Sequence, residues 1–323
     1  MTRIAIIGNC GHGGGYVLKQ LHTTPDAQVV GISPSAADDL DRLAEACAAA
    51  GQRPERCGDR AAVLALEPDL VVVDSVIGHH AADCIAALRA GCHVFCEKPC
   101  ATTLAELDAV EHAWRASGRV CLGMFGLRYQ AAIFTAWSLL QERRIGELRL
   151  MQAQKSYKLG QRPGWYHDRH SFGGMIPWVG SHAIDWLHWC SASAGTVLSA
   201  HHSRRANAGH GDLETSASVH LVFPPDVSGT VCCDYFRAED APSHGDDRLR
   251  LVGTDGCLEV RHGRCLLDDR EQPLRSAPGI LADVLGMCSD RPGLMDSAEH
   301  FVVTRCCLLA RDRADAGSAG SQG

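Results

Sequence analysis

The chain has 323 residues, 46% of them hydrophobic, and a formal net charge of -7. A chain of this length buries about three quarters of its unfolded surface and usually forms two globular domains. The acidic balance and the lack of a basic patch exclude nucleic acid and an anionic membrane as expected partners, so a small-molecule ligand is predicted.

Short apolar runs alternate with helical patterns over the first 122 residues. The predicted strands read RIAIIG, AQVVGIS, LVVVDSV, HVFCEKP and VCLGMF, and the predicted helices cover about 13–23, 36–50, 81–90 and 103–117. Strands interleaved with helices of ten or more residues indicate a doubly wound parallel sheet. Residues 1–122 are therefore predicted to form an α/β Rossmann domain that binds NAD or NADP.

The alternation of strands and helices ends in the second part of the chain. Helices are predicted at about 131–142, 172–189 and 294–311, and strands include LRLMQAQKSYK, SASVHLVFP and GTVCCDYFRA. Hairpin-like runs without intervening helices indicate an open, mainly antiparallel sheet with helices on one face. Residues 123–312 are predicted to form an α+β substrate-binding and oligomerisation domain, and the small polar tail at 313–323 is predicted to be disordered.

The N-terminus and the cysteines bear on the cellular compartment. The first apolar run breaks at Gly8, and no stretch approaches 18 apolar residues, so neither a secretory signal nor a membrane helix is expected and a cytoplasmic location follows. The sixteen cysteines are scattered through apolar segments, which is typical of reduced core thiols. Cys92, Cys96 and Cys100 lack paired C-x-x-C spacing, so no metal site is predicted.

The first strand-helix turn carries the first candidate site. It reads GNCGHGG, close to G-x-G-x-x-G but with Cys10 in place of the second glycine, which normally lets the backbone approach a pyrophosphate. The helix N-terminus still offers amides and a favourable dipole to phosphate. An ordinary glycine-rich turn is the alternative. The predicted cofactor-binding residues here are Gly8, Cys10, Gly11, His12, Gly13 and Gly14.

The end of the second strand bears on the choice between NAD and NADP. An NAD-specific domain usually has a carboxylate there for the ribose hydroxyls, but this chain has Ser33 and Ser35, and Asp38 and Asp39 follow. No arginine stands beside the serines to hold a 2'-phosphate. Ser33 and Ser35 are predicted to contact the ribose, and the cofactor stays open between NAD and NADP.

The segment FGGMIPWVGSHAIDWLHW carries a further group of candidate site residues. Trp178, His182, Asp185 and Trp189 follow each other at spacings of four, three and four, which places them on one stripe of a helix. A stripe that mixes aromatic rings, a histidine and a carboxylate is typical of the wall of a sugar-sized pocket, with core packing as the alternative. The polar and aromatic segment upstream is predicted to be a loop that contacts substrate through Tyr157, Arg162, Trp165, Tyr166 and His167.

One further motif points to a family. With the Rossmann start, GCHVFCEKP resembles the E-K-P signature of the Gfo/Idh/MocA oxidoreductases, which are named for glucose-fructose oxidoreductase and inositol dehydrogenase. HHAADCIAALRAG, the LRY at 127–129, the GSHAIDW helix and the trailing sheet match as well. The resemblance covers nearly the whole chain.

The resemblance implies catalytic roles for two residues. Lys98 is expected beside the nicotinamide as the base that takes the hydroxyl proton of a sugar or cyclitol, while the hydride goes to the cofactor. His182 matches the histidine of the family's D-x-G-x-H-x-x-D motif and is expected to hydrogen-bond or deprotonate the same hydroxyl, with a core histidine bound by backbone groups as the alternative. Asp185 matches the last aspartate of that motif and is expected to orient His182 or to bind substrate, with a capping or structural role as the alternative. Trp178 replaces the first aspartate, and we expect it to stack on an apolar sugar face.

The family pattern also extends the cofactor and substrate sites. Ser75, Val76, His80 and Glu97 are expected to line the nicotinamide side of the cofactor site, with capping of the following helix as the alternative for His80. Arg128 and Tyr129 match an arginine-aromatic pair at the domain junction, where Arg128 either contacts substrate or forms a structural ion pair.

The leading functional hypothesis is an NAD(P)-dependent oxidoreductase acting on a hydroxyl of a sugar, cyclitol or glycoside. One alternative is a redox-neutral lyase or glycosidase that oxidises the sugar transiently with tightly bound cofactor. Another is a non-catalytic NAD(P)-binding sensor, against which the presence of both Lys98 and His182 argues. Relatives commonly cover the open sheet face in dimers or tetramers, so a homodimer or homotetramer is expected.

Overall fold

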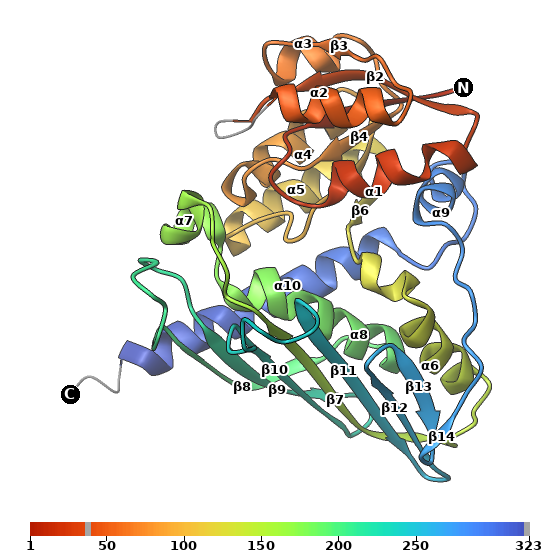
Figure 1. Cartoon of the computed structure of the whole chain (residues 1–323), viewed down its shortest axis with the longest axis vertical. Coiled ribbons are helices and arrows are strands. Elements are labelled where there is room, and N and C mark those ends of the chain that lie inside the picture. The colour runs from red at the N-terminus through yellow and green to blue at the C-terminus, as the bar shows by residue number, and fades with distance from the viewer. Residues whose placement is uncertain (36–39, 320–323) are drawn as a thin grey trace. The chain divides into compact units, whose positions relative to one another are not determined.

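The computed structural model describes residues 1–35 and 40–319 and forms two compact units (Figure 1). Unit 1 comprises Met1–Met124 and Pro278–Phe301, and unit 2 comprises Phe125–Ala277 and the chain from Val302 onward. Residues 278–301 thus belong to unit 1, although the sequence predicts that all of 123–312 forms the second domain. The reason is that a segment late in the chain packs on the early fold, as the bond from the Leu281 amide to Gln20 Oε1 shows (3.0 Å).

Unit 1 contains a six-stranded parallel sheet with strand order β3-β2-β1-β4-β5-β6, which confirms the predicted doubly wound fold. Its strands are β1 (Thr2–Ile7), β2 (Ala27–Ser33), β3 (Glu55–Arg56), β4 (Leu70–Val73), β5 (His93–Cys96) and β6 (Cys121–Gly123). Its helices include α1 (Gly13–Gln20), η1 (Leu21–Thr23), α2 (Leu40–Ala49), α3 (Arg60–Leu64), η2 (Ile77–His79), α4 (His80–Arg89), α5 (Leu104–Ser117) and α9 (Ile280–Met287).

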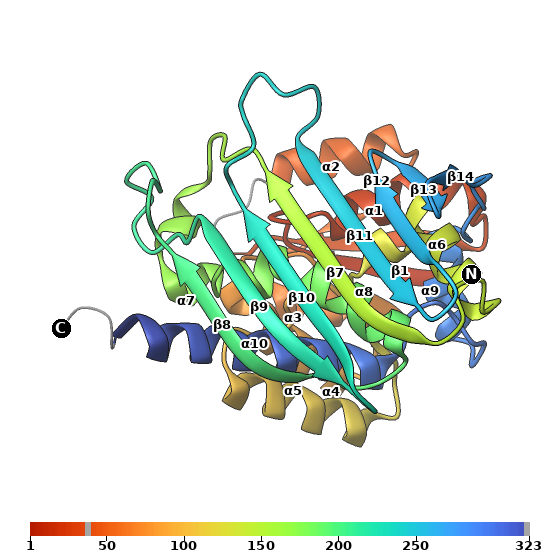
Figure 2. The same cartoon turned by 90° about the horizontal axis from the view of Figure 1, so that it is seen from below.

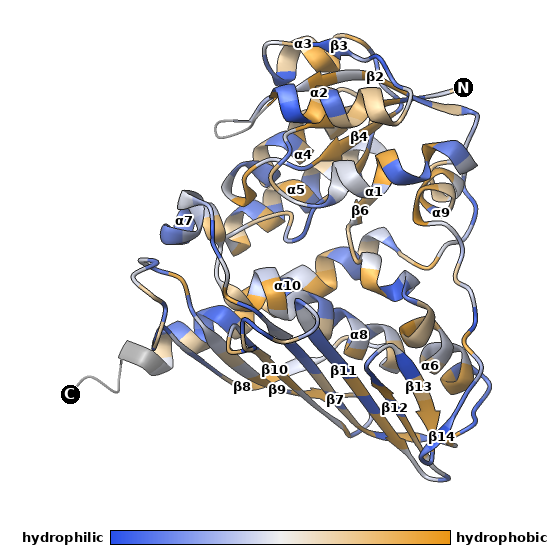
Figure 3. Ribbon diagram, in the orientation of Figure 1, coloured by the Kyte–Doolittle hydropathy of each residue, from blue (hydrophilic) through white to orange (hydrophobic). Residues whose placement is uncertain are grey.

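The apolar strands of unit 1 follow from its layered architecture. All four residues of β4 are buried, and Figure 3 shows this strand as hydrophobic. A parallel sheet covered by helices on both faces requires such continuous apolar runs. The strand order reverses between β1 and β4, and in open α/β sheets ligands bind at the carboxyl ends of the strands beside this reversal. The residues directly after β1 and β4 are therefore the first place to look for a site.

Unit 2 contains an eight-stranded mixed sheet with order β14-β13-β12-β11-β7-β10-β9-β8, in which only the β7–β10 pair is parallel among the described strand pairs. Its strands are β7 (Leu148–Tyr157), β8 (Thr196–Ser203), β9 (Ser216–Phe223), β10 (Val227–Asp234), β11 (Gly245–Gly253), β12 (Cys257–Arg261), β13 (Arg264–Leu267) and β14 (Arg270–Glu271). Its helices include η3 (Gly126–Tyr129), α6 (Ala131–Gln141), η4 (Gly164–His167), α7 (Arg169–Phe172), η5 (Ile176–Gly180), α8 (Ser181–Ser191) and most of α10 (Ser297–Ala319).

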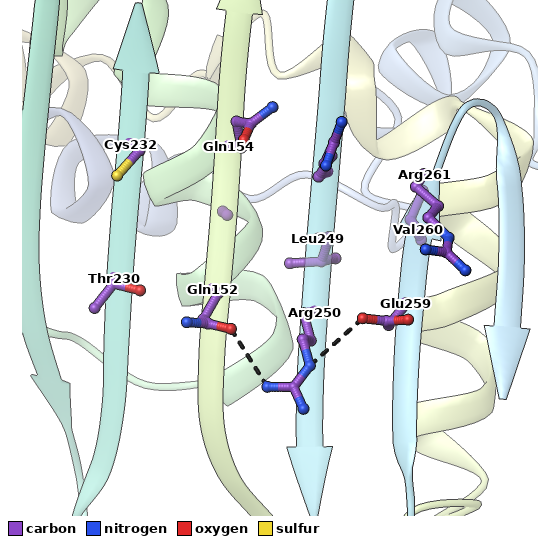
Figure 4. Close-up of a pocket in the computed structure, with 11 residues that line it drawn as sticks. Gln152, Gln154, Thr230, Cys232, Leu249, Arg250, Glu259, Val260 and Arg261 are labelled. Carbon is purple, nitrogen blue, oxygen red and sulfur yellow. Dashed lines mark hydrogen bonds and ion pairs between the residues drawn. The ribbon is translucent and has the colours of Figure 1, made fainter. Parts of the chain in front are cut away.

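The two faces of this sheet differ in polarity. Figure 2 shows the strands side by side with α6 and α8 behind them. Along β7, Met151, Ala153 and Lys155 are buried, whereas Gln152 is exposed, as the period of two in a strand requires. The opposite face carries a hollow of about 310 Å³, in which Arg250 contacts both Gln152 (3.3 Å) and Glu259 (3.5 Å) (Figure 4).

The end of the chain differs from its prediction. The tail was expected to be disordered from 313, but α10 continues to Ala319, so the prediction is wrong for 313–319; residues 320–323 lie outside the described part. Ala314 is 1% exposed, and Arg313 donates to the carbonyl oxygen of Val197 (3.0 Å). Alanine favours helix, and packing on β8 supplies the stabilisation that the polar composition hides.

The predicted helix at 172–189 is interrupted. Residues Ile176–Gly180 form a π-helical turn, and α8 begins only at Ser181. A π-turn adds a residue to the helical period, so the side chains before it are rotated about the helix axis relative to those after it. The interpretation of Trp178, His182, Asp185 and Trp189 as one stripe is therefore wrong at Trp178. The predicted helix at 36–50 is observed from Leu40, and residues 36–39 lie outside the described part.

All sixteen cysteines are free thiols, twelve of them buried, in agreement with the core role expected of most of them. Cys232 is the exposed exception, on the polar face of β10. Over residues 1–35 and 40–319, the helices are too short or too polar to cross a bilayer.

Candidate functional site

The turn after β1 has the backbone geometry of a dinucleotide loop. Gly8 has φ +85°, and a Cβ at Gly8 would lie 2.4 Å from the Ser75 Cα, so β1 and β4 approach each other more closely than a side chain permits. A Cβ at Gly13 would lie 2.5 Å from the Met124 Cε. Gly8 and Gly13 thus fill the tight-turn and close-packing roles of the first and third motif glycines, and the residues present fit an NAD(P) pyrophosphate at the start of α1.

Two acidic side chains that the sequence analysis did not place in the loop bind its amides. The amides of Gly13 and Gly14 donate to Asp74 Oδ1 and Oδ2, each at 3.1 Å, and the His12 amide donates to Glu97 Oε2 (3.0 Å). Burial, and then the charge of Glu97, raise the pKa of Asp74 to about 7. The sequence signal that could have placed Asp74 at this loop is its position directly after the apolar run of β4.

The ribose end of the cofactor site differs from the prediction. Ser33 is 0% exposed, so the ribose contact expected from its hydroxyl is wrong. Ser35 is half-buried, and its Oγ lies 3.2 Å from Nδ1 of His79, which is exposed at the start of α4. His79 was missed because the family pattern drew attention to His80 alone.

Side chains of the β4–α4 turn bind protein groups. The Ser75 hydroxyl donates to Asp83 Oδ2 (2.6 Å), and Val76 is 5% exposed. Both ring nitrogens of His80 contact backbone carbonyl oxygens, of Pro99 (2.7 Å) and of Ser75 (2.8 Å). His80 ties this turn to the E-K-P turn and is 0% exposed, so the direct cofactor contact expected of its side chain is wrong.

Lys98 is the second residue after β5 and is 4% exposed. Its Nζ is 3.7 Å from Glu97 Oε1, and that oxygen also accepts the Lys98 amide (3.2 Å). Glu97 therefore joins the amine of the E-K-P turn to the dinucleotide loop. The catalytic role of Lys98 stays a prediction.

In unit 2, His182 stands out by its exposure. From Ile176 to Cys190, every residue is buried except His182, which is half-buried. Its ring meets the edge of Phe125 at 6.4 Å between centroids. A histidine that reaches accessible space from an otherwise buried helix can meet a ligand, and its catalytic role also stays a prediction.

Asp185 and Arg128 have a structural role. The Arg128 guanidinium binds the Asp185 carboxylate through Nε (2.9 Å to Oδ2) and Nη2 (2.6 Å to Oδ1), and both side chains are 1% exposed. The guanidinium also lies over Trp189, which stacks on Trp137 at 4.5 Å. Because both side chains are closed off from solvent, the substrate contacts expected of Asp185 and Arg128 are wrong, and the structural alternative holds for both residues.

The segment around η4, which is predicted to contact substrate, brings several predicted residues together. Trp178 is 7% exposed and meets Trp165 (6.2 Å) and Tyr166 (6.4 Å) edge to face. The Arg162 guanidinium lies 5.4 Å from the Tyr166 ring and 4.5 Å from that of Tyr235, which the sequence analysis missed. Arg162, Trp165, Tyr166 and Trp178 therefore form one cluster. His167 is not part of it in the contacts described: its Nε2 lies 2.8 Å from His210 Nδ1.

A second group lies on the helix-covered face of the sheet. Lys155 is 0% exposed and binds Asp247 Oδ2 at 2.5 Å, and burial lowers the pKa of Lys155 to about 8 despite that partner. Its Nζ lies 4.9 Å from the Tyr157 ring and 5.1 Å from the Trp186 ring. Tyr157 and Asp247 also line a cavity of about 710 Å³ within unit 2, together with Gln130, Ser243 and His262 among others.

One cluster has the composition of a metal site. Ligand atoms of His202, Glu214 and Asp315 lie within 4.8 Å of one another. The Arg169 guanidinium pairs with Glu214 and lies 3.1 Å from Asp315. Because Arg169 supplies the positive charge that the carboxylates require, we interpret the cluster as an ion-pair network.

Comparison with known proteins agrees with this geometry. The model of the oxidoreductase family with an NAD-binding Rossmann fold matches residues 2–125, and that of the GFO/IDH/MocA C-terminal domain matches residues 133–259. A solved putative oxidoreductase from Thermotoga maritima is 37% identical, with a TM-score of 0.93 over 98% of each chain.

Curated relatives are more distant. Inositol 2-dehydrogenase 2 of Saccharopolyspora erythraea is 27% identical over 85% of this chain and 77% of its own length. D-glucoside 3-dehydrogenase of Escherichia coli is 29% identical over 57% of this chain, and the match spans 52% of that protein. The two family models together match most of the chain, and they agree with the glycine loop after β1 and the E-K-P turn after β5: the chain belongs to the Gfo/Idh/MocA family of NAD(P)-dependent oxidoreductases.

Proposed function

We propose that the protein transfers a hydride between NAD(P) and a secondary hydroxyl of a sugar, cyclitol or glycoside. The observation that carries the proposal is the exposure of His182 on a helix that is otherwise buried from Ile176 to Cys190. The names of two relatives, a D-glucoside 3-dehydrogenase and an inositol 2-dehydrogenase, support polyhydroxylated rings as the substrate class. A cavity of about 710 Å³ in unit 2, to which Gln130, Asp247 and His262 contribute polar groups, is in the size range of small-molecule sites.

The chemistry divides between cofactor and side chains. When bound, the nicotinamide accepts or returns the hydride. We assign Lys98 to the hydroxyl proton, because an amine held by Glu97 at 3.7 Å keeps a fixed position beside the dinucleotide loop. We assign His182 to a hydrogen bond with the reacting hydroxyl. Asp185 has no part in this assignment, since its carboxylate is bound by Arg128.

A panel of sugars, inositols and glycosides tests the proposal, with nicotinamide absorbance and product release followed together. Reduced cofactor that accumulates with an oxidised ring supports it. Product release without net reduction supports the redox-neutral lyase or glycosidase instead. Cofactor binding without turnover across the panel supports the sensor. With any substrate of the panel that the wild type turns over, His182→Ala is expected to lower kcat by about 10²-fold. His201→Ala, at an exposed histidine of β8, should leave kcat unchanged.

For assembly, we propose that the polar face of the eight-stranded sheet contacts a second copy of the chain in a homodimer or homotetramer. Support comes from the mixture of donors and acceptors on this face, with Arg250 between Gln152 and Glu259 (Figure 4). A two-fold interface needs such a self-complementary surface. Sedimentation of the wild type and of Arg250→Glu tests it: a dimer that persists unchanged in the variant contradicts this face as the interface.

A further inference from the structure

The start of α1 holds two acids where a dinucleotide loop usually presents free amides to phosphate. The three consecutive amides of residues 12–14 donate to Glu97 and Asp74 at 3.0–3.1 Å. Asp74 is 0% exposed and Glu97 is 2% exposed. A Cβ at Gly11 would lie 2.6 Å from Asp74 Oδ1 and 2.7 Å from Glu97 Cγ, so the loop lies directly on both side chains.

This arrangement places the carboxylates of Asp74 and Glu97 at the N-terminus of α1. The N-terminus of a helix carries a partial positive charge that stabilises a carboxylate or a phosphate. A dinucleotide pyrophosphate carries negative charge to the same end, and in a buried site like charges repel more strongly than in water. The protein can relieve that repulsion by binding a proton.

Asp74 is the acid best suited to accept the proton. Its pKa is raised to about 7, whereas that of an ordinary aspartate is near 3.8. The groups that face the cluster are Glu97 after β5, His80 of α4 and Tyr16 of α1, with Lys98 beside Glu97. Two amide bonds and His80 favour the charged form of Asp74, while burial and Glu97 oppose it. Asp74 is thus poised between its two forms near neutral pH.

We propose that Asp74 tunes cofactor affinity by taking up one proton from solvent when the pyrophosphate binds at the start of α1. The proton adds to the Asp74 carboxylate, and the uncharged carboxyl group keeps its carbonyl oxygen as an acceptor for an amide. Affinity therefore falls as pH rises through the range in which free Asp74 loses its proton. The inference rests on the NAD(P) site that family membership gives and is independent of the proposed substrate.

Calorimetric titration of the full chain with NADH tests this without turnover. Repeating the titration at about pH 7 in buffers of different ionisation enthalpy measures the protons taken up per cofactor bound. We expect the uptake of a clear fraction of a proton per NADH bound. The Kd for NADH is expected to be about tenfold higher at about pH 8 than at about pH 6. Zero uptake together with a pH-independent Kd overturns the proposal.

Variants assign the proton to Asp74. Asp74→Asn removes the charge, and Asp74→Ser keeps an acceptor of smaller size in case the asparagine amide disturbs the loop. In either variant that folds, proton uptake is expected to vanish and the affinity at about pH 8 to match that at about pH 6. Asp26→Asn, at an exposed aspartate before β2, is the matched control and should behave as wild type. Unchanged proton uptake in the Asp74 variants overturns the assignment.

Discussion

Arg128 and Asp185 form a buried bidentate ion pair that joins η3 to α8 within unit 2. Arg128 also lies over the rings of Phe125 (5.9 Å) and Trp189 (5.1 Å). The pair therefore fixes the first turn after the Rossmann strands against the helix that carries His182. The carboxylate of Asp185, the last aspartate of the family motif, is therefore bound by a group of the fold.

Asp185→Ala should lower the free energy of unfolding by about 3 to 5 kcal/mol, because it leaves the Arg128 guanidinium buried without its counter-ion. Urea unfolding followed by tryptophan fluorescence measures this. Glu147→Ala, which breaks the exposed pair with Arg149, should cost less than about 1 kcal/mol and serves as control. A small stability loss for Asp185→Ala combined with a raised KM would contradict the structural role and support the substrate contact predicted from the sequence.

The buried amine of Lys155 should make stability depend on pH in a characteristic direction. Its pKa is about 8 in the folded protein and 10.5 ordinarily. Between these values the unfolded chain holds the proton that the folded chain has released, so this group favours folding increasingly as pH rises. The full difference corresponds to about 3 kcal/mol.

The measurement is the difference in unfolding free energy between wild type and Lys155→Met across about pH 7 to 10. Taking the difference matters because buried thiols such as Cys96, with a pKa raised to about 12, contribute in the opposite direction in both proteins. We expect the unfolding free energy of the wild type to increase relative to that of Lys155→Met as pH rises. A constant difference would show that Lys155 keeps its ordinary pKa.

The order of strands and helices in unit 1 was predictable because each apolar run of a parallel sheet is buried on both faces and bounded by turn residues. The capping box at Thr103 and Glu106 likewise marks the start of α5 in the sequence and in the structure. The π-turn at 176–180 was not predictable, since Pro177 and Gly180 do not distinguish a π-turn from an ordinary helix start.

The candidate site was predictable where one motif encodes it and not where distant segments meet. Glycines and the E-K-P turn locate the cofactor loop, but only the fold shows that Asp74 and Glu97, 23 residues apart in sequence, bind its amides. Tyr235 meets Arg162 for the same reason, through the neighbouring ends of β7 and β10. The family pattern singles out Arg128 and Asp185, but only the fold shows that the two side chains bind each other.

Trp178→Ala should reduce the free energy of unfolding by about 3 to 5 kcal/mol, because the indole is 7% exposed and packs against Trp165 and Tyr166. Trp178→Phe should lose less, since a ring remains to meet both neighbours. Urea unfolding and KM are measured together. If Trp178→Ala raised KM with unfolding unchanged, the indole would contact substrate, as predicted from the sequence.

Discrimination between NAD and NADP should be weak, below roughly a hundredfold or about 2.7 kcal/mol, because no carboxylate among the described residues stands at the end of β2. Ser35→Asp should shift the preference toward NAD by binding ribose hydroxyls and repelling a 2'-phosphate. Fluorescence titration gives both dissociation constants, with Ser289→Asp, at an exposed serine of unit 1, as control. A strong NAD preference in the wild type would mean that another group reads the ribose.

Lys98→Met should reduce turnover by about 10²-fold or more, in line with the loss of a positioned acid-base group. Glu97 keeps its bond to the His12 amide in this variant, so the cofactor loop stays supported and the dissociation constant for NADH should change little. Lys19→Met, at an exposed lysine of α1, controls for the loss of one positive charge from unit 1. Steady-state kinetics and NADH titration together separate chemistry from binding. Near-normal kcat in Lys98→Met would remove Lys98 from the chemistry, whereas a matching loss of NADH affinity would make it a cofactor-binding residue.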